Sequence, residues 1–260
     1  MVTLTFAPAE LPAVRERICN FIIAQHDAAG ASGAVIGLSG GIDSSLVATL
    51  AVEALGAENV HGLSLPADVS ATRHQDDAMQ LADDLDIVLD VIDVEPIVET
   101  LTDAAPVVVD ERARGNARAR IRADMNYLVS NAAGGRLVLG TGNRSEALVG
   151  YFTKYGDGAV DCHPIGNLYK CQVRQVARHV GVPADVVEKT PTAELWANHT
   201  DEDELGITYD TLDRILALHV DGPLSSAATA DTLGCDLDLV DHVDSLVAAS
   251  AHKRMMPPSP

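Results

Sequence analysis

Residues 33–52 read GAVIGLSGGIDSSLVATLAV, a glycine-rich loop between two apolar runs. The first run, residues 33–38, is short and continuous, which is typical of a strand buried on both faces of a parallel sheet. The second run is long enough for a helix. Adjacent glycines let backbone amides approach a ligand closely, and a helix N-terminus favours an anion. The stretch therefore predicts a strand, an anion-binding loop and a helix in succession.

The rest of the chain repeats this alternation of apolar runs with stretches of helical periodicity. Strands separated by helices predict an α/β fold, with a parallel, twisted sheet covered by helices on both faces. Beyond residue 183 the pattern changes to short helices and turns, which predicts a helical C-terminal extension. No repeat or linker interrupts the pattern, so we expect a single domain, 1–260. The expected strands span 33–38, 60–66, 86–93 and 136–141, and the expected helices 11–29, 44–55, 71–85, 95–104, 111–133, 169–181 and 236–254.

The charge balance is strongly acidic, with 38 Asp and Glu against 18 Lys and Arg and a formal net charge of -20. At low salt such a surplus repels itself, whereas concentrated salt screens the repulsion. We therefore interpret the composition as a halophilic adaptation to a salty cytoplasm. The same surplus argues against non-specific binding to nucleic acid, whose phosphates are negative.

The sequence also bears on the cellular compartment. No segment approaches the ~18 uninterrupted apolar residues that a membrane helix needs, so we expect no membrane association. The N-terminus has no basic segment followed by an apolar one, so no signal peptide is expected. The 4 cysteines form no CxxC pair, which argues against a zinc or redox site and favours a reduced, cytoplasmic setting.

Lysine is scarce in this acidic chain and is confined to Lys154, Lys170, Lys189 and Lys253. Where surface lysine is depleted, the lysines that remain favour specific roles. Most of the basic residues fall between Arg112 and Lys189, and this local positive density favours an anionic ligand. The alternative is a set of ion pairs on helix surfaces, each of which contributes little.

Asp43 stands in the glycine-rich loop, at the end of which a Walker-type loop carries lysine. Gly40 and Gly41 let amides point at a polyphosphate, and the hydroxyls of Ser39 and Ser44 can donate hydrogen bonds. Alternatively, the segment is a simple turn in which Asp43 caps the next helix. The pattern S-G-G-x-D-S after a strand is the signature of the ATP-pyrophosphatase loop, which grips the β,γ-pyrophosphate of ATP.

A second polar loop, GTGNRSE at residues 140–146, follows the fourth expected strand. Because ligands bind beyond the carboxyl ends of parallel strands, both loops should face one crevice. Thr141 can hydrogen-bond a nucleotide there. Glu146 and Asp43 supply the one or two carboxylates that Mg²⁺ prefers beside phosphate oxygens. Alternatively, Ser145 or Glu146 simply caps the helix that follows.

The segment ERARGNARARIRADMNY, residues 111–127, is rich in arginine. Arg118 and Arg122 are i,i+4 neighbours on the expected helix, with Arg120 displaced around it. Like charges so close repel each other, so an anion between some of them would stabilise the arrangement. The alternative is pairing with acidic neighbours, namely Asp110, Glu111 and Asp124.

Two later segments carry further charged residues that suit a polar ligand. The loop YFTKYGDGAVDCHPIGNLYK contains Lys154, a point charge for phosphates, and Asp161, which can accept from hydroxyl or amide groups. The segment AHKRMMP places His252 and Lys253 at the last helical end. The helix dipole alone would also favour cations at that end.

Together these motifs resemble ammonia-dependent NAD synthetase over nearly the whole chain, from about Pro12 to Pro257. The segments SGGIDSS, GNARARIR, GTGNRSE, GYFTKYGDGAVD, KTPTAEL, DEDELGITYDTLD and HKRMMP are similar to that family in order and spacing. The resemblance implies an adenine-nucleotide α-hydrolase-like fold. It also implies a reaction in which the carboxylate of deamido-NAD attacks the α-phosphorus of ATP, releasing pyrophosphate, and ammonia converts the NAD-adenylate to NAD and AMP.

The resemblance further implies Mg²⁺, held by Asp43 and Glu146, and a homodimer with the dinucleotide across the subunit interface. Asp43, Glu146 and Lys170 would act on the reacting phosphates. Lys154 could serve the partner's site, and Lys189 receives no role. The ATP site would comprise Gly37, Leu38, Ser39, Gly40, Gly41, Ile42, Asp43, Ser44, Thr141, Lys170 and Thr192. The deamido-NAD site would comprise Arg120, Lys154, Asp161, His252 and Lys253.

The chain departs from the family at Ile42, where bacterial members often have Gln. It shows no amidase domain of the glutamine-dependent kind, so free ammonia is the expected nitrogen donor. Two other interpretations stay open: another ATP-pyrophosphatase, such as a GMP-synthetase-type amidotransferase subunit or a tRNA-modifying enzyme, and a non-catalytic nucleotide-binding sensor. The acidity disfavours tRNA, and a mere sensor does not need two metal carboxylates together with Lys170.

Overall fold

The computed structural model describes residues 3–67, 72–189 and 201–259 of the chain. At its centre is a 4-stranded parallel sheet in the order β3-β2-β1-β4. The predicted α/β class and the parallel sheet are therefore confirmed. The strands are β1 (Ala34–Gly37), β2 (Val60–Ser64), β3 (Val88–Val91) and β4 (Leu137–Leu139).

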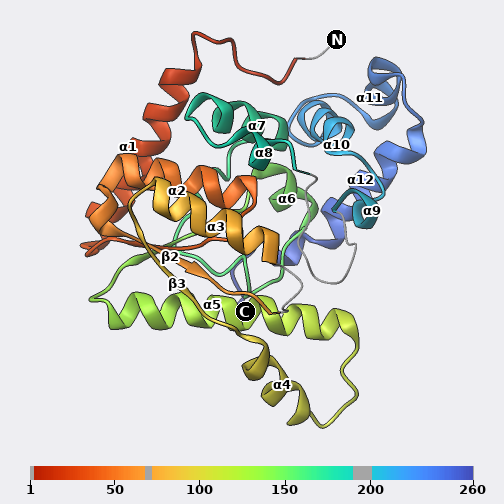
Figure 1. The fold of residues 1–260 in the computed structure, drawn as a ribbon. Helices are drawn as coiled ribbons and strands as arrows, with labels where there is room; N and C mark the ends of the chain where they lie inside the picture. Colours follow the sequence, from red (N-terminus) through yellow and green to blue (C-terminus); the bar gives the residue numbers. More distant parts are fainter. Residues whose placement is uncertain (1–2, 68–71, 190–200, 260) are drawn as a thin grey trace.

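Helices cover both faces of this sheet, as Figure 1 shows. α2 and α3 lie on one side of the sheet, where α1 and α7 also pack against α2. α5 lies on the opposite side, with α4 packed against it. These helices match the predicted ones closely. They are α1 (Leu11–Ala29), α2 (Ile42–Leu55), α3 (Thr72–Asp84), α4 (Glu95–Asp103), α5 (Glu111–Ala132) and α7 (Lys170–His179).

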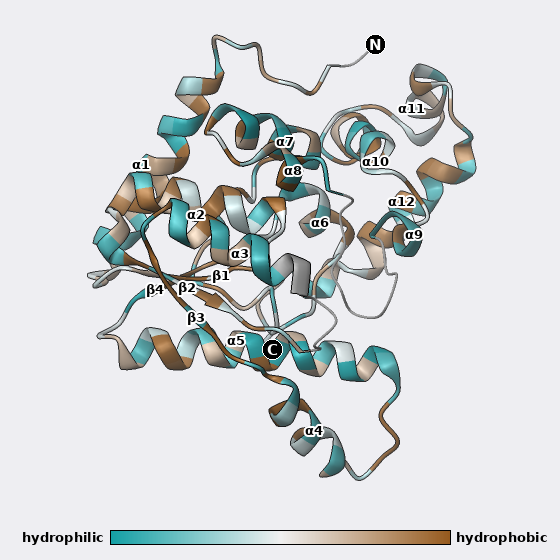
Figure 2. Cartoon of the chain, viewed as in Figure 1, coloured by the Kyte–Doolittle hydropathy of each residue, from teal (hydrophilic) through white to brown (hydrophobic). Residues whose placement is uncertain are grey.

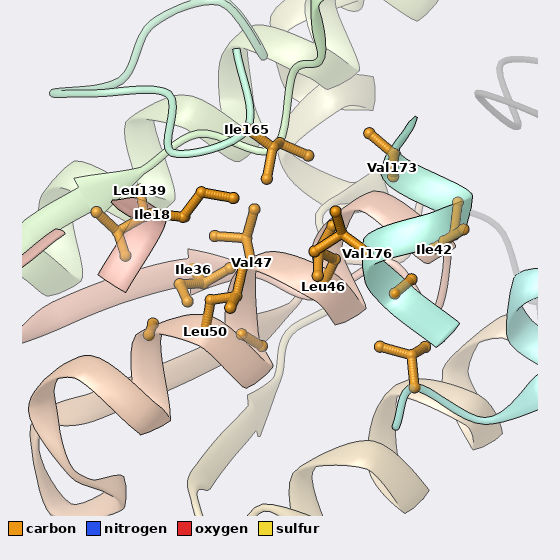
Figure 3. Packing of buried hydrophobic residues seen from close by; sticks show 14 of the residues in the cluster. Ile18, Ile36, Ile42, Leu46, Val47, Leu50, Leu139, Ile165, Val173 and Val176 are labelled. Carbon is orange, nitrogen blue, oxygen red and sulfur yellow. The ribbon is translucent and has the colours of Figure 1, made fainter. Parts of the chain in front are cut away.

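Alternate residues of β1 face opposite layers, as the two-residue period of a strand requires. Ala34 and Ile36 belong to the apolar cluster formed with α1, α2 and α7. Val35 belongs to a second cluster on the other face, with Leu63 of β2 and Ile121 of α5. Much of the sheet is coloured as hydrophobic in Figure 2, as a sheet covered on both faces requires, although the edge strand β3 is largely exposed. Figure 3 shows Ile36 among neighbours that include Ile18, Val47, Leu139 and Val176.

The C-terminal part forms the predicted helical extension and has an apolar cluster of its own. Tyr209, Leu212 and Ile215 are fully buried in it. Val149 and Tyr169, next to the second polar loop and α7, join the same cluster, so the extension is tied to the crevice. Its elements are α9 (Asp201–Leu205), α10 (Tyr209–Ile215), a π-helical turn (Leu216–Val220), α11 (Ser226–Leu233), α12 (Leu237–Ala249) and a 3₁₀ turn (Ala251–Lys253).

The strand order places a topological switch point beside β1. The chain runs outward from β1 through β2 to β3, and then crosses back to β4 on the other side of β1. Ligands bind at such points, beyond the carboxyl ends of the strands. The two predicted loops follow β1 and β4, so they lie side by side there. None of the described helices is long and apolar enough to span a bilayer, and the cysteines are free thiols.

Candidate active site

The loop after β1 is ordered by its own serine hydroxyls, since the Ser39 N–H donates to Ser44 Oγ and the Gly41 N–H donates to Ser39 Oγ, each at 3.3 Å. It turns at Gly40, whose φ of 75° is a left-handed conformation that glycine adopts readily. α2 then begins with Gly41 as its N-cap residue, and no side chain caps it. The Ser44 hydroxyl lies 3.2 Å from that of Ser39 and donates to the Gly41 carbonyl at 3.0 Å. The alternative prediction that Asp43 caps this helix is therefore wrong, and the uncapped first turn suits an anion.

Three charged side chains from distant parts of the chain meet beside this loop. Lys170 Nζ lies 2.6 Å from Asp43 Oδ2 and 3.0 Å from Glu146 Oε1. The same ammonium lies 5.0 Å from the centre of the Tyr209 ring, within the range of a cation–π contact. Lys170 is only 2% exposed, so its ammonium is buried, while the side chains of Asp43 and Glu146 are 18% and 16% exposed. The two carboxylates that the sequence assigns to a metal thus converge on one cationic atom.

Each member of the triad is held at the start of a helix. Asp43 lies in the first turn of α2, and Asn143 Nδ2 donates to its Oδ1 at 3.0 Å. Glu146 belongs to α6 (Arg144–Val149), where Asn143 Oδ1 accepts from its backbone N–H and its Oε2 accepts from the Asn143 N–H. Lys170 begins α7, and its backbone N–H donates to Ser145 Oγ at 2.9 Å. The N-cap residue of α6 is therefore Asn143, not Ser145 or Glu146 as the alternative prediction held, while Glu146 completes the capping box and also faces Lys170.

The electrostatics of the triad keep one group charged and bring another close to neutrality. Burial raises the pKa of Glu146 to about 7, because the attraction of Lys170 only partly offsets burial and the repulsion of Asp43. Burial alone would lower the pKa of Lys170, but the two carboxylates outweigh it and raise that pKa. Lys170 is therefore a permanent cation, while Glu146 gains or loses a proton near physiological pH.

A second hydrogen-bonded group lies behind the triad. Tyr209 Oη lies 3.3 Å from Glu146 Oε1 and 3.1 Å from Asp201 Oδ2. Tyr151 Oη lies 3.1 Å from Asp201 Oδ1 and 3.0 Å from Glu204 Oε2. Burial, together with the neighbouring carboxylates, raises the pKa of Tyr209, so its hydroxyl stays protonated and donates. The network connects the triad to α9 and α10 of the C-terminal extension.

The triad opens into a cavity of about 440 Å³, a volume in the usual range of small-molecule sites. Of the other residues predicted for ATP, Gly40 is not part of the lining of the cavity, and Thr192 lies outside the described residues. Lys189, which the sequence left without a role, lines the cavity, pairs with Asp77 and lies 3.5 Å from the Gly40 carbonyl. The predicted site residues that line the cavity are Gly37, Leu38, Ser39, Gly41, Ile42, Asp43, Ser44, Thr141, Glu146, Lys170 and Lys253.

The other residues predicted for the dinucleotide do not line this cavity. Arg120 Nε donates to the Lys154 carbonyl at 3.3 Å, and Lys154 Nζ donates to the His252 carbonyl at 2.7 Å. These three residues thus form one connected group. Asp161 accepts from the backbone N–H of Val138 in β4 at 2.8 Å, which places it at the edge of the sheet. Their part in binding a dinucleotide stays a prediction.

The arginine-rich helix finds partners that the sequence did not indicate. Arg114 Nη1 lies 2.8 Å from Glu95 Oε1, and Arg118 Nε lies 3.0 Å from Glu95 Oε2. Arg122 Nε donates to the Leu65 carbonyl at 2.8 Å, beyond the end of β2. Glu95 was missed because only the packing of α4 on α5 brings it near. Of the acidic neighbours considered from sequence, Asp110 caps α5 by accepting from the Ala113 N–H.

Two other members of the site were not predicted from the sequence, and only one of them carries a recognisable sequence pattern. Asn143 could have been found, because an Asn three residues before Glu in GTGNRSE is the spacing of a capping box. Tyr209 carries no such signal. It follows a run of acidic residues in the C-terminal extension, and only the packing of that extension brings its hydroxyl to Glu146.

The donor set fits a magnesium ion. Carboxylate oxygens are the hard ligands that Mg²⁺ prefers, and Asp43 and Glu146 already direct theirs at a single positive charge. No cluster of three or more His, Cys, Asp or Glu in the described parts of the chain could hold a metal by itself. A site of two carboxylates suits an ion that takes its remaining ligands from water and substrate phosphates.

Comparison with known proteins gives a consistent result. The family model described as NAD synthase matches residues 14–257. The NH(3)-dependent NAD(+) synthetase of Halobacterium salinarum is 56% identical over 258 residues, covering 99% of this chain and 96% of the relative. Among solved structures, an NMN synthetase from Francisella tularensis has a TM-score of 0.85 at 34% identity, covering 98% and 99% of the two chains. An NH3-dependent NAD synthetase from Campylobacter jejuni, in complex with nitrate, has a TM-score of 0.79 at 30% identity, covering 96% and 99%.

Proposed function

The chain belongs to the NAD synthase family, and from that premise we propose that it amidates deamido-NAD with ammonia in an ATP-dependent reaction. The observation that carries the proposal is the meeting of Asp43, Glu146 and Lys170 beside an uncapped phosphate loop. Phosphoryl and nucleotidyl transfers depend on positioning and on neutralising charge, and these residues supply both. We treat residues 1–260 as one functional unit of this family.

The proposed chemistry needs activation of a carboxylate, which is a poor acyl donor. The nicotinate carboxylate attacks the α-phosphorus of ATP, forming an acyl adenylate and releasing pyrophosphate. Ammonia then attacks the acyl carbon, giving NAD and AMP. The amides and hydroxyls of the loop from Gly37 to Ser44 would hold the β- and γ-phosphates, and Lys170 would offset charge on the reacting phosphate. A proton acceptor for the incoming ammonia is not assigned to any residue.

The proposed metal role belongs to Asp43 and Glu146. Mg²⁺ held by these carboxylates would neutralise the phosphate oxygens and favour departure of pyrophosphate. Lys170 and such an ion would share the same pair of carboxylates. Asn143 keeps Asp43 oriented in either case, through its 3.0 Å hydrogen bond. Thr141 and Thr192 complete the proposed ATP site.

We further propose a homodimer in which Arg120, Lys154, Asp161, His252 and Lys253 bind the dinucleotide near the subunit interface. Lys253 lines the cavity, whereas Arg120, Lys154 and His252 form a connected group that is not part of its lining, and a site shared between subunits would bring this group to the dinucleotide. Exposed apolar side chains on α4 and before α5 favour a partner surface. They are Ile97, Leu101, Val107 and Val108, the last 98% exposed. A cytoplasmic location would supply ATP and reduced conditions.

The decisive assay supplies deamido-NAD, ATP, Mg²⁺ and ammonium in concentrated KCl and quantifies NAD, AMP and pyrophosphate. We expect the three products in equal amounts. Absence of NAD from folded protein would refute the assignment. Formation of ADP instead of AMP would refute cleavage between the α- and β-phosphates. Light scattering of the same sample tests the dimer.

A second acceptor deserves the same assay, because the Francisella structure that this chain closely resembles is an NMN synthetase. The alternative substrate is nicotinic acid mononucleotide, which carries the same carboxylate but lacks the adenylate half of deamido-NAD. Comparing kcat/KM for the two acceptors decides between them. We expect deamido-NAD to be preferred, since the 56% identical relative is named an NAD synthetase.

A further inference from the structure

Asn126 has a buried amide oxygen that the described structure leaves without a hydrogen bond. It lies on α5 and lines the cavity, yet no described residue donates to its Oδ1. A buried acceptor without a partner costs about 1–3 kcal/mol, so such atoms are rare in native proteins and require an explanation. Neither the expected reaction nor the predicted site residues give this side chain a task.

The position of Asn126 points to the nucleoside part of the nucleotide. A Cβ built on Gly37 would lie 3.6 Å from its Nδ2 and 3.9 Å from its Oδ1, so the amide lies over the carboxyl end of β1. Gly37 immediately precedes the loop that we assign to the phosphates. One turn earlier on α5, Arg122 bonds the Leu65 carbonyl and so fixes this face of the helix against the end of β2.

Part of the cavity wall is apolar, which suits the faces of a planar base. Leu38, Leu63, Leu65 and Leu139 all line the cavity and are almost fully buried. A purine loses little free energy when its ring faces are buried against such a surface, but the polar atoms on its edge need hydrogen-bond partners. Asn126 provides a donor and an acceptor side by side. Rotation of the amide by 180° exchanges the two, so either order can be presented.

We propose that Asn126 hydrogen-bonds the edge of the adenine of ATP and makes the cavity selective for adenine. Adenine offers an amino donor beside a ring-nitrogen acceptor, the pattern that an Asn amide complements with two hydrogen bonds. On the edge formed by the 6-substituent and N7, hypoxanthine, the base of ITP, presents a carbonyl acceptor beside the N7 acceptor, so neither orientation of the amide complements both atoms. The inference rests on the proposed use of ATP, and it adds a specificity-determining residue to that site.

The test compares Asn126→Leu with Asn131→Leu, an exposed position on the same helix. Dissociation constants for ATP, ITP and 2′-deoxy-ATP are measured by calorimetry with Mg²⁺ in concentrated KCl, without any nicotinate substrate. We expect the wild type to prefer ATP over ITP. Asn126→Leu should weaken ATP binding about tenfold to a hundredfold while changing ITP binding little. Asn131→Leu should behave like the wild type.

Equal loss of ATP and ITP affinity in Asn126→Leu would mean a structural role and would overturn the proposal. So would a change confined to the ratio of ATP to 2′-deoxy-ATP, which would assign the amide to the ribose. Asn126→Asp separates folding from recognition, because it keeps the shape and the acceptor for the adenine amino group but replaces the donor with a second acceptor. It should weaken ATP binding but keep the preference for ATP over ITP, because only the amino group of adenine can donate to the carboxylate. Since binding is measured without an acceptor substrate, failure to form NAD would refute the proposed function and leave this result intact.

Discussion

The ammonium of Lys170 lies 2.6 Å from the carboxylate of Asp43, although 127 positions separate the two residues in the chain. Glu146 approaches the same ammonium from a third segment. The lysine therefore occupies the place between two carboxylates that a divalent cation would also favour. A positive charge between these carboxylates stabilises the folded chain whether the lysine or a metal ion supplies it. The lysine and the metal should therefore be able to replace each other electrostatically.

Replacing Lys170 by methionine should make the fold depend on magnesium. Methionine keeps most of the side-chain volume but leaves two partly buried carboxylates facing each other, and breaking a fully buried pair in this way costs about 3–5 kcal/mol, which is the upper limit here. Urea unfolding in concentrated KCl with a chelator should show that loss. Added Mg²⁺ should raise the stability of Lys170→Met far more than that of the wild type.

The matched control is Arg178→Met, which removes an exposed cation from an ion pair with Glu188 on the surface of the same helix. It should change little, because solvent screens such pairs. If Mg²⁺ stabilised the wild type and Lys170→Met equally, the lysine and the metal would not share these carboxylates.

Glu146→Gln should remove a pH-dependent contribution to stability. The folded-state pKa of Glu146, about 7, lies above the ordinary value of 4.5, so between these values the folded chain holds a proton that the unfolded chain releases. That contribution favours folding below pH 4.5 and is lost as the pH rises through about 7. In chelator, the stability of wild type relative to Glu146→Gln should fall over this interval and stay level above it.

Subtracting the stability–pH curve of Glu146→Gln from that of the wild type cancels the contributions of the many other carboxylates of this acidic chain. Glu99→Gln, at an exposed position of α4, serves as the control and should run parallel to the wild type. A difference curve for Glu146→Gln that is flat between pH 4.5 and 7 would contradict a raised pKa.

Asn143→Ser should weaken metal binding while it preserves the helix. Serine is a good N-cap residue, so α6 should keep its start, but its hydroxyl is too short to replace the 3.0 Å bond to Asp43. Groups that orient metal ligands typically contribute about tenfold to a hundredfold in metal affinity. Titration of the free enzyme with Mn²⁺, followed by electron paramagnetic resonance, measures this metal affinity. Unchanged Mn²⁺ affinity would show that Asp43 needs no such support or does not bind the metal.

Glu95→Ala should loosen α4 and leave the site intact. Glu95 receives both Arg114 and Arg118 from α5, and a hydrogen bond to a charged group contributes about 1.5–3 kcal/mol. Hydrogen exchange should therefore accelerate in residues 95–103, whereas ATP binding in the cavity should persist. Glu99→Ala on the exposed side of α4 is the control. Equal exchange in both variants would mean that apolar packing alone holds α4.

Removal of salt should unfold the chain. A net charge of -20 spread over a small protein repels itself strongly when the Debye length grows, as it does from about 3 Å at 1 M salt to about 30 Å at 0.01 M. Circular dichroism during dialysis from concentrated to dilute KCl should report loss of helix. A chain that stays folded and active in dilute KCl would overturn the halophilic interpretation.

Much of the fold could be predicted from the sequence because its determinants are local. The period of apolar residues distinguishes the run before Gly37 from the helix after it. Loops at strand ends predict a shared crevice once the sheet is known to be parallel. The positions of Asp43, Glu146 and Lys170 in that crevice also follow from motifs of fixed spacing. What the motifs could not predict is that Lys170 would lie between the two carboxylates.

Other features depended on packing between distant segments. Glu95 reaches Arg118 because α4 folds back on α5, and Tyr209 reaches Glu146 because the C-terminal extension covers the loop. Nothing in the sequence marked the unsatisfied amide oxygen of Asn126, because a lone polar residue on a long helix gives the same sequence pattern whether its side chain faces water or a cavity. Sequence alone determined the class of fold, the glycine-rich loop between β1 and α2 and the ionic character of the chain, which local periodicity and composition encode. Only the tertiary structure decided which charges meet and which atoms lose water, because both depend on distances between segments that the chain brings together by folding.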